Sequence, residues 1–587
     1  MSRTNRFVLG RLLVVMLAGM LFLARSEVAA QTSTQIQNVT KPQITAIQDA
    51  AAARSTAQQK MASQLLDALK EKETGSVVSN APNLKPGPLT ETPEGVLLDI
   101  KAKVSDELLS EIQRLGGKVY NNFPEDDAIR ASMPLENIET LAGRPDVQQV
   151  HPAVKARKNA IVPVAKEGDT AHAANLVRSK LGVRGAGIKV GVISDSIDSG
   201  YGDLQKAFDD GAMDRDKLAV LPGQDGNGFV DSSGEGLAMA EIIHVLAPDA
   251  RILFATGYGG PAQMAANIRE LVRQGCLVIV DDLTYNDESP FQDGPISQAV
   301  NYASSSGVLY FSSARNSGNK KQGSSGTWEG DFLDGGPAGP EYKKTEPKGR
   351  IHIFAVTPDG NRITLNTIDI ASGGDRLDLF WSDPLGGATN QYDLFLVNPT
   401  GQVVLSSTTS VNGQQNPYQS IERIKQGYSI VIVKRSGSGD RFMHLDSGRA
   451  VLRYSTEGSV RGHNASGADN AFCVAAKQVP TPIRLFTSKD AVSLEKFCSD
   501  GPRRIFFQPD GTPLTPGNFS SAGGLVLRKP DITAADGVST TLSRDSGLNP
   551  FSGTSAAAPH AAGIAALLLS CDPRPSADQV RRALEKT

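Results

Sequence analysis

Residues 188–194, IKVGVIS, form an almost unbroken apolar run, and this stretch decides the fold. A strand without polar alternation is buried on both faces, as the strands of a parallel sheet are. Three more such strands follow it, and helical stretches separate them: RILFAT, CLVIV and VLYFSSA alternate with AMAEIIHVLA, AQMAANIRELVRQG and ISQAVNYASSSG. This alternation predicts an α/β fold with an open, doubly wound parallel sheet, in which function lies at the carboxyl ends of the strands.

A different pattern interrupts the alternation between residues 320 and 456. Short strands such as IHIFAV, LDLFWS, YDLFLV and YSIVIVKR lie between Gly, Asn, Asp and Pro turns, with no helical stretch among them. Regularly spaced short strands predict a β-sandwich. Because α/β features resume afterwards, we interpret residues 320–456 as an inserted β-sandwich domain that divides an α/β domain into residues 169–319 and 457–587.

The first 30 residues have the pattern of an export signal. Three arginines precede the apolar run of residues 12–23, and small residues end at Ala30. This pattern predicts a signal peptide over residues 1–30 and a secreted protein, extracellular or periplasmic. The apolar run is shorter than the ~20 residues that cross a bilayer, so we expect no membrane span after the signal is removed.

Two segments separate this signal from the α/β domain. Residues 31–93 are rich in Gln, Ala and Ser, contain a helical stretch near Met61 and end in a Pro-containing run, which predicts a leader and linker. Residues 94–155 alternate strand-like and helix-like pieces in a βαββαβ-like order. This order predicts a small α+β domain.

The composition restricts the class of partner. The 587 residues contain 60 Lys+Arg against 63 Asp+Glu, so no basic field indicates a nucleic-acid partner. Hydrophobic residues at 39% and charged residues at 21% are typical of a folded chain rather than a disordered one. The 4 cysteines are too few to form a disulfide scaffold, although export would permit Cys473 to pair with Cys498.

Residues 551–560, FSGTSAAAPH, carry the strongest chemical signal. A Gly-containing turn opens an apolar helix there, and a serine hydroxyl at a helix start lies near unpaired amides that stabilise a negative oxygen. Ser552 or Ser555 could equally be an N-capping residue. The turn alone leaves both interpretations open.

The neighbouring motifs favour the first interpretation. VGVISDSID, SSARN, FCSDGP, KPDIT and GTSAAAPH resemble, in this order, the conserved blocks of subtilisin-like serine proteases, over roughly residues 169–319 and 457–587. The resemblance implies a subtilisin-like fold with Ser555 as nucleophile, Asp195 as the acid after the first strand and Asn316 as the oxyanion-hole amide. It also implies that the α+β domain is a propeptide, which assists folding, inhibits the enzyme and is cut away. The expected partners are a protein or peptide substrate and the chain's own propeptide.

The chain departs from the family at the general base. Where the family has His-Gly-Thr at the start of a helix, this chain has Glu235. His244 lies nine residues further along the same helix, so it points ~180° away and lies ~13 Å further on. His560 lies ~140° around its helix from Ser555 and is more often a structural residue in this family. Neither histidine can replace an imidazole at position 235.

A carboxylate can act as the base when it is ionised and within hydrogen-bond reach. An ordinary glutamate pKa of ~4.3 makes it weak at neutral pH, but repulsion from Asp195 and partial burial would raise one pKa of the pair. The set is similar to that of sedolisins, acid-active relatives that use Glu, Asp and Ser. Their Asp lies four residues after the Glu, where this chain has Met239, and their oxyanion residue is Asp rather than Asn. The chain therefore resembles a hybrid of the two families.

Two further positions stand beside this set. Asp281 and Asp282 end the strand CLVIV, where subtilisins line the substrate cleft, and side-chain alternation allows only one of them to face it. Asp282 aligns with the cleft position, so it is a candidate third carboxylate of the proton network or a selector for basic side chains. A turn-stabilising role is an equal alternative. Arg315 replaces the usual glycine before Asn316.

The predicted sandwich contains acidic turns around Asp378, Asp383 and Asp393. Oxygen-rich loops of this kind can hold calcium, but the spacing matches no EF-hand loop, and solvated turn acids explain them at least as well. We therefore expect no cofactor and no catalytic metal, and leave a structural calcium ion open. Trp381 alternates with leucines and is expected in the core.

Together these features predict a secreted serine endopeptidase, made as a self-processed precursor, that works through an acyl-enzyme. Glu235 takes the proton of Ser555 and Asp195 orients and tunes Glu235, which predicts best activity at mildly acid pH. The alternative is an inactive pseudoprotease that binds peptides or cell-surface polymers. A third, weaker interpretation is an enzyme that cuts only itself.

Overall fold

The computed structural model describes most of the chain. It covers residues 39–154, 166–227, 232–338, 348–371, 375–487, 490, 494–543 and 546–586. The predicted signal peptide, residues 1–30, lies outside the described residues. Within the described ranges, no helix has both the length and the hydrophobicity needed to cross a membrane.

The α/β domain contains a seven-stranded parallel sheet, which confirms the predicted fold class. Its strand order is β27-β24-β10-β9-β6-β8-β7. The run IKVGVIS supplies β6, inside the sheet, and every neighbouring pair is parallel. The strands are β6 (Lys189–Ser194), β7 (Leu218–Val220), β8 (Arg251–Thr256), β9 (Val278–Asp281), β10 (Leu309–Ser313), β24 (Ala471–Gln478) and β27 (Ile532–Asp536).

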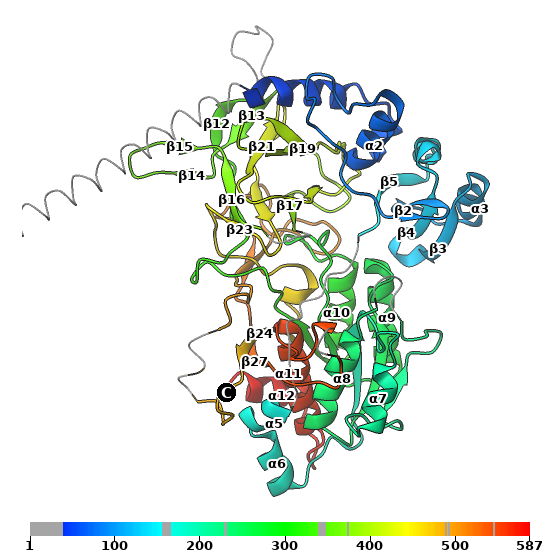
Figure 1. The fold of residues 1–587 in the computed structure, drawn as a ribbon, viewed down its shortest axis with the longest axis vertical. Coiled ribbons are helices and arrows are strands. Elements are labelled where there is room, and N and C mark those ends of the chain that lie inside the picture. Colours follow the sequence, from blue (N-terminus) through cyan, green and yellow to red (C-terminus); the bar gives the residue numbers. More distant parts are fainter. Residues whose placement is uncertain are drawn as a thin grey trace, which may run out of the picture.

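Helices cover both faces of this sheet (Figure 1). Val190 and Val192 of β6 pack into one core with residues of α8 and α11, whereas Ile193 packs into a second core with residues of α9 and α10. This division explains why β6 shows no polar alternation, because both of its faces are buried. The helices are α5 (Lys166–Ala171), α6 (Ala174–Leu181), α7 (Asp203–Asp209), α8 (Glu235–Leu246), α9 (Pro261–Arg273), α10 (Pro295–Ser305), α11 (Thr554–Leu569) and α12 (Ala577–Leu584).

Between β10 and β24 the chain forms two antiparallel sheets, which we call the β-module (residues 327–452). One sheet has the order β11-β22-β17-β20, and the other joins β12, β13, β21, β16 and β23, with β18 and β19 beside β21. Trp328, Trp381 and Ile432 are among the side chains from both sheets that share one core. The strands are β11 (Thr327–Asp331), β12 (Asp334–Pro337), β13 (Gly349–His352), β14 (Ala355–Val356), β15 (Arg362–Ile363), β16 (Asn366–Ile370), β17 (Arg376–Trp381), β18 (Tyr392–Val397), β19 (Val403–Ser407), β20 (Tyr418–Glu422), β21 (Ser429–Arg435), β22 (Phe442–Asp446) and β23 (Val451–Leu452).

A smaller α+β unit precedes the α/β domain, and we call it the N-terminal module (residues 91–154). Its antiparallel sheet places β2 between β4 and β5, with β3 beyond β4 and the short β1 also paired to β2. Ser105 caps α3 by accepting a hydrogen bond from the backbone of Leu108. The elements are β1 (Glu91–Thr92), β2 (Gly95–Ala102), α3 (Asp106–Arg114), β3 (Lys118–Phe123), β4 (Ala128–Met133), α4 (Ile138–Ala142) and β5 (Val147–Pro152).

Within the segment in which the sequence indicated a leader and linker, the structure describes residues 39–93. Residues 39–52 and α2 (Ser63–Thr74) are helical and run along the β-module (Figure 1). Ile44 and Ile47 enter a core that they share with Phe395 and Val431 of the β-module. Hydrogen bonds support this contact, because the Gln48 side chain donates to Asp393 at 2.8 Å and the Ser63 amide donates to Thr409 at 2.9 Å.

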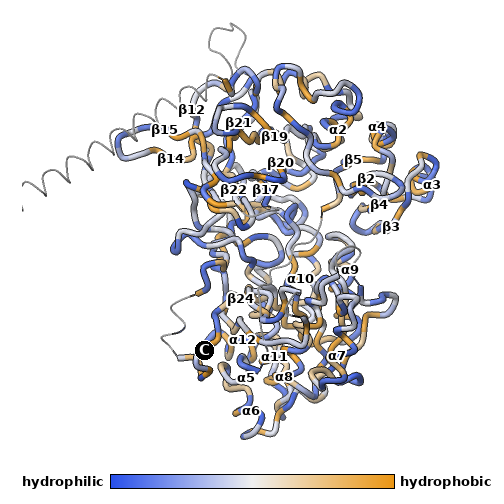
Figure 2. The backbone as a smooth tube through the Cα atoms, in the orientation of Figure 1, coloured by the Kyte–Doolittle hydropathy of each residue, from blue (hydrophilic) through white to orange (hydrophobic). Residues whose placement is uncertain are grey.

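The distribution of hydropathy agrees with this division into parts. Figure 2 shows hydrophobic segments inside the α/β domain, around α8 and α11, and along the strands of the β-module. Apolar cores of this kind are separate for the α/β domain, the β-module and the N-terminal module. The contacts between these parts include apolar side chains, such as Phe291 of the α/β domain with Phe380 and Phe442 of the β-module, as well as buried charged groups.

Candidate active site

Ser555 lies within the first turn of α11, one residue beyond Thr554. The N-cap position belongs to Gly553, so Ser555 is not the capping residue. The Gly553 amide donates to the carboxylate of Asp536 at 2.9 Å, which fixes the turn before the helix. Ser555 is fully buried, and its Oγ has no hydrogen-bond partner among the described residues. The hydroxyl is therefore not committed to a structural contact.

Asp195 follows β6 and accepts hydrogen bonds from the loop that precedes α8. Its Oδ1 accepts from the amides of Ser196 at 2.6 Å and Glu235 at 3.1 Å. Its Oδ2 accepts from the amide of Ser233 at 2.7 Å and from the Ser233 hydroxyl at 2.6 Å. Asp195 thus holds the main-chain N–H of Glu235 at the start of α8.

Glu235 is the first residue of α8 and is completely buried. Gly234 precedes it at φ +77°, a left-handed conformation that glycine adopts without strain. The Gly234 amide donates to the Ser196 hydroxyl at 2.9 Å. The start of α8 is therefore fixed to the end of β6 at two neighbouring residues.

The Glu235 carboxyl forms a hydrogen bond with the carboxyl of Asp282, which follows β9. Burial, the charge of Glu235 and this hydrogen bond raise the pKa of Asp282 well above its ordinary value, and Asp195 adds to the effect. A hydrogen bond between two carboxyl groups requires one proton between them. The structure therefore brings Glu235 and Asp282 together as one proton-sharing pair beside Asp195.

The neighbouring Asp281 points to the other side of the strand, as the alternation requires. Its Oδ1 accepts from the Ser312 hydroxyl at 2.9 Å and lies 3.1 Å from Nε2 of His463. The other ring nitrogen of His463 lies 2.5 Å from Glu288. Burial alone would lower the pKa of His463, but the carboxylates of Glu288 and Asp281 raise it to about 10. This buried imidazolium was not foreseen from the sequence, because GHN at 462–464 matches no motif.

Tyr258, in the loop after β8, is a second residue that sequence reasoning missed. Burial and the negative charges of Asp195, Glu235 and Asp282 raise the pKa of its phenol above the ordinary value. The phenol therefore lies close to all three carboxyl groups and stays protonated. Only the fold could reveal this neighbour, because the four residues come from different segments of the chain.

Asn316 lies in the loop after β10, with its amide oxygen turned toward the nucleophile helix. Its Oδ1 accepts from the Thr554 amide at 3.3 Å and from the Thr554 hydroxyl at 3.0 Å. With the oxygen held in this way, the amide nitrogen faces away from Thr554 as a donor. Arg315 before it has φ +71°, the left-handed conformation that explains why the related proteases place glycine there.

Neither histidine considered from the sequence belongs to the set. The ring of His244 lies 3.7 Å from the carboxylate of Asp214, and burial lowers its pKa. The ring of His560 lies 2.7 Å from the Ala556 carbonyl and packs against His172, and burial lowers the pKa of His560 to about 4. Both rings are engaged away from the carboxyl pair.

The acids of the β-module that suggested calcium each contact an arginine. The distances between carboxylate oxygen and guanidinium nitrogen are 2.9 Å for Asp378, 2.7 Å for Asp383 and 2.7 Å for Asp393. Within the described ranges, no group of three or more His, Cys, Asp or Glu could hold a metal ion. Trp381 is fully buried, and the thiols of Cys473 and Cys498 are both free.

The N-terminal module lies against the segments that flank the carboxyl pair. Arg130 donates to the carbonyls of Val154 at 3.0 Å and Tyr258 at 3.4 Å, and Asn121 donates to Gly259 at 3.2 Å. Val154 packs into the α9 and α10 core together with Leu283. A cavity of about 530 Å³ lies between this module, the β-module and the α/β domain, with His151, Asp287 and Tyr418 in its walls.

Comparisons with known proteins bear on the family of this chain. Among the solved structures to which the chain is similar is the protease CspB of Clostridium perfringens, at 14% identity, with 69% of this chain and 88% of that chain covered and a TM-score of 0.41. Another is fervidolysin of Fervidobacterium pennivorans, at 14% identity, with 85% of this chain and 58% of that chain covered and a TM-score of 0.32. No curated protein matches the sequence. Residues 185–587, more than half of the chain, match the model of the subtilase family, peptidase S8. The chain therefore belongs to the subtilase family.

Proposed function

We propose that this chain is a serine endopeptidase that cleaves peptide bonds through an acyl-enzyme on Ser555, with Glu235 as the general base. The observation that carries the proposal is the buried hydrogen bond between the carboxyl groups of Glu235 and Asp282. The proposal is supported by the position of Glu235, because the start of α8 corresponds to the place where the subtilase family has its histidine.

In the proposed reaction, Oγ of Ser555 attacks the peptide carbonyl carbon and its proton passes to Glu235. Asp282 keeps its own proton, which it donates in the hydrogen bond to the ionised carboxylate of Glu235. The developing oxyanion is stabilised by the side-chain amide of Asn316 and by the amides at the start of α11. Glu235 then returns the proton to the leaving amine, and water releases the acyl group by the same steps.

Ser555 and Glu235 are not hydrogen-bonded in this structure, because the serine Oγ has no partner among the described residues. Catalytic hydrogen bonds are often long in the absence of substrate and tighten only when substrate binds. We propose that substrate binding brings the two groups into contact, directly or through one water molecule. The raised pKa of Asp282 fits a base that works best at mildly acid pH.

We further propose that the protein is exported as a precursor whose residues 94–155 act as propeptide. Three features support this: the predicted signal peptide, the position of Val154 against Leu283, and the contacts of Arg130 and Asn121 with residues 258–259. The predicted site of cleavage lies between about residues 152 and 170. The proposed location is extracellular or periplasmic.

The alternative is a pseudoprotease that binds peptides without cleaving them. The absence of a hydrogen-bond acceptor for the Ser555 hydroxyl among the described residues favours it. The commitment of Asp195, Thr554 and Asn316 to the turns around Ser555 and Glu235 weighs against it, because a binding protein has no need of all of them.

A serine-reactive fluorophosphonate probe separates these functions. We expect the purified protein to be labelled at Ser555 and to cleave a denatured protein substrate, with an optimum below pH 7. Ser555→Ala should lower kcat by about 10⁴-fold or more, and Glu235→Gln by a similar factor. Glu241→Gln is the matched control, because Glu241 is buried on the same helix but hydrogen-bonds to Thr541.

Failure of labelling from pH 3 to 9 would support the pseudoprotease. Cleavage by Glu235→Gln at the rate of the unaltered chain would overturn the role of Glu235. Mass spectrometry of the Ser555→Ala precursor tests self-processing, since that chain should remain uncut where the unaltered chain is cut. Self-cleavage without turnover of any added substrate would identify an enzyme that cuts only itself.

A further inference from the structure

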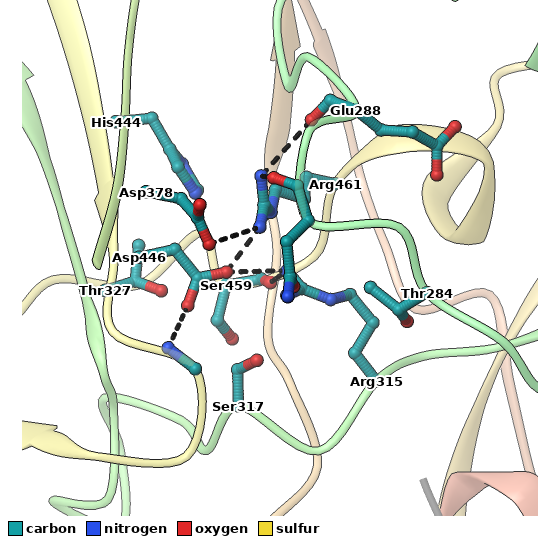
Figure 3. Close-up of polar contacts among 12 residues, drawn as sticks. Thr284, Glu288, Arg315, Ser317, Thr327, Asp378, His444, Asp446, Ser459 and Arg461 are labelled. Carbon is teal, nitrogen blue, oxygen red and sulfur yellow. Dashed lines mark hydrogen bonds and ion pairs between the residues drawn. The ribbon is translucent and has the colours of Figure 1, made fainter. Parts of the chain in front are cut away.

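The side chain of Arg315, in the loop after β10 that also contains Asn316, extends to Asp446 of the β-module (Figure 3). Its Nη1 lies 2.8 Å from Oδ2 of Asp446 and donates to the Ser459 carbonyl at 3.0 Å. The exposed fractions of the Arg315 and Asp446 side chains are 4% and 0%. The residue directly before Asn316 is therefore joined to the inserted β-module by an ion pair that is shielded from water.

Asp446 is itself held firmly, at the end of β22. Its Oδ1 accepts from the Gly448 amide at 2.7 Å, and its Oδ2 lies 3.2 Å from Nε of Arg461. Arg461 in turn donates to the carbonyls of Asn286 at 2.7 Å and Glu288 at 3.2 Å. Figure 3 shows Asp446 between the two guanidinium groups. A buried carboxylate with two cationic partners and one amide donor has little freedom to move.

The cluster contains a second carboxylate, Asp378, which lies 3.6 Å from Arg461 and 2.9 Å from Arg376. Burial alone would raise the pKa of Asp446, but Arg315 and Arg461 lower it below the ordinary value. Asp446 is therefore ionised throughout the pH range in which the proposed peptidase works, and its hold on Arg315 is constant there.

The Arg315 main chain is fixed from the α/β domain. Its carbonyl accepts from the Ser499 amide at 3.2 Å, and the Ser317 amide donates to the Ser499 hydroxyl at 3.0 Å. A residue other than glycine at φ +71° carries backbone strain of about 1–2 kcal/mol, and this conformation persists only where surrounding contacts hold it. The ion pair with Asp446 is such a contact, and it bears on the residue that sets the direction of Asn316.

We infer that Asp446 of the β-module is a positioning residue, which holds Arg315 in its left-handed conformation and thereby aims the amide of Asn316 at the oxyanion. This inference rests on the proposed peptidase function. It makes the β-module part of the machinery for transition-state stabilisation. The relation between the two parts of the chain is direct, because the residue held by Asp446 is adjacent in sequence to the oxyanion donor.

A double-mutant cycle on kcat tests this role. Asp446→Asn should lower kcat by about 10- to 100-fold, with KM changed less than about threefold. Complete loss of one oxyanion donor lowers kcat by about 10²–10³-fold, and a displaced Asn316 amide should lower it less. Arg315→Met, which keeps a long side chain at φ +71° but removes the charge that pairs with Asp446, should have a similar effect. The double variant should be no slower than the slower single variant, since both changes break the same link.

Asp393→Asn is the matched control. Asp393 is a fully buried carboxylate of the same β-module, paired with Arg435 at 2.7 Å and without contact to Arg315. Its kcat should stay within about twofold of the unaltered chain. Equal losses of kcat in the Asp446 and Asp393 variants, or single effects that multiply in the double variant, would overturn the positioning role.

Amide hydrogen exchange of the loop that contains Asn316 tests the positioning role without a measurement of catalysis, so its result is independent of the proposed function. We expect residues 314–319 to exchange at least about tenfold faster in Asp446→Asn and in Arg315→Met than in Asp393→Asn. If the unaltered chain shows no labelling of Ser555, the proposed function fails, yet faster exchange of the loop still supports the positioning of Asn316. Unchanged exchange in both the Asp446 and the Arg315 variant overturns it, whether or not the chain is active. If Asp446→Asn does not fold, Arg315→Met alone decides the question.

Discussion

At the scale of single residues, the main feature is one proton shared by Glu235 and Asp282. Two buried carboxylates in contact cannot both ionise without a large cost, so one of them retains a proton at a pH at which an isolated carboxyl would lose it. Asp282 is the partner whose pKa is raised, so it keeps its proton and can donate it in the hydrogen bond to Glu235. Asp195 contributes charge and accepts a hydrogen bond from the backbone of Glu235.

The first prediction concerns Asp282→Asn. Asparagine at this position cannot ionise, so the raised pKa of Asp282 disappears from the pH profile. Activity should fall when Asp282 ionises, because the hydrogen bond to Glu235 is then lost, so the alkaline limb of the kcat/KM profile should move to higher pH in the variant by about one unit or more, measured with a peptide substrate from pH 3 to 9. Asp281→Asn is the control, since Asp281 faces His463 and should leave the alkaline limb in place. An equal shift in both variants would contradict the assignment.

At the scale of elements, the end of β27 holds the turn that presents Ser555. Asp536, at the end of β27, accepts from the Gly553 amide at 2.9 Å. Burial raises the pKa of Asp536 to about 7, although the Gly553 hydrogen bond lowers it. The turn before α11 is thus held by a carboxyl whose ionisation depends on pH.

The second prediction follows from this raised pKa. The stability that Asp536 contributes is fully present below its ordinary pKa near 3.8 and is lost as the pH rises through about 7. Asp536→Asn removes this dependence, so its Tm should fall less between pH 5 and pH 8 than that of the unaltered chain. Asp209→Asn, at an exposed position on α7, should keep the original slope. Calorimetry at both pH values measures the difference.

Elements with a local pattern could be predicted from the sequence, and contacts across the fold could not. The strand at 188–194 and the helix after FSGTS carry their periodicity and turn residues within a short window. Ile44 and Ile47, by contrast, find their partners on Phe395 and Val431, so a segment rich in Gln and Ala looked like a linker. The pairing of Glu235 with Asp282 joins α8 to the end of β9, and His463 reaches Asp281 from a third segment. Nothing near each residue in the sequence indicates these contacts.

At the scale of the whole molecule, buried arginines join the modules to one another. Arg130 pairs with Asp99 inside the N-terminal module, at 2.6 Å, and donates to the Tyr258 carbonyl of the α/β domain at 3.4 Å. Arg315 and Asp446 join the α/β domain to the β-module. Such pairs contribute little net stability in themselves, but removal of one partner leaves a buried charge without compensation.

The third prediction concerns Arg130→Gln. Loss of the guanidinium leaves Asp99 buried without its cation and should destabilise the N-terminal module by about 3–5 kcal/mol. Arg114→Gln is the control in the same module, because the Arg114 side chain is 66% exposed and its pair with Glu111 should contribute less than about 1 kcal/mol. Limited proteolysis in increasing urea compares the two full-length variants. Equal resistance would contradict the role of the Arg130 pair.

Residues 39–154 have two separate attachments to the rest of the molecule. The segment from residue 39 to α2 contacts the β-module, and the N-terminal module contacts the α/β domain beside Tyr258. A cut between Val154 and Lys166 breaks neither of them. Each attachment keeps the other at a high effective concentration, so the severed piece rebinds at one surface before it has left the second. The fragment then dissociates only when both attachments are open at the same time. A weak affinity at each surface is therefore enough to slow dissociation of the cleaved fragment.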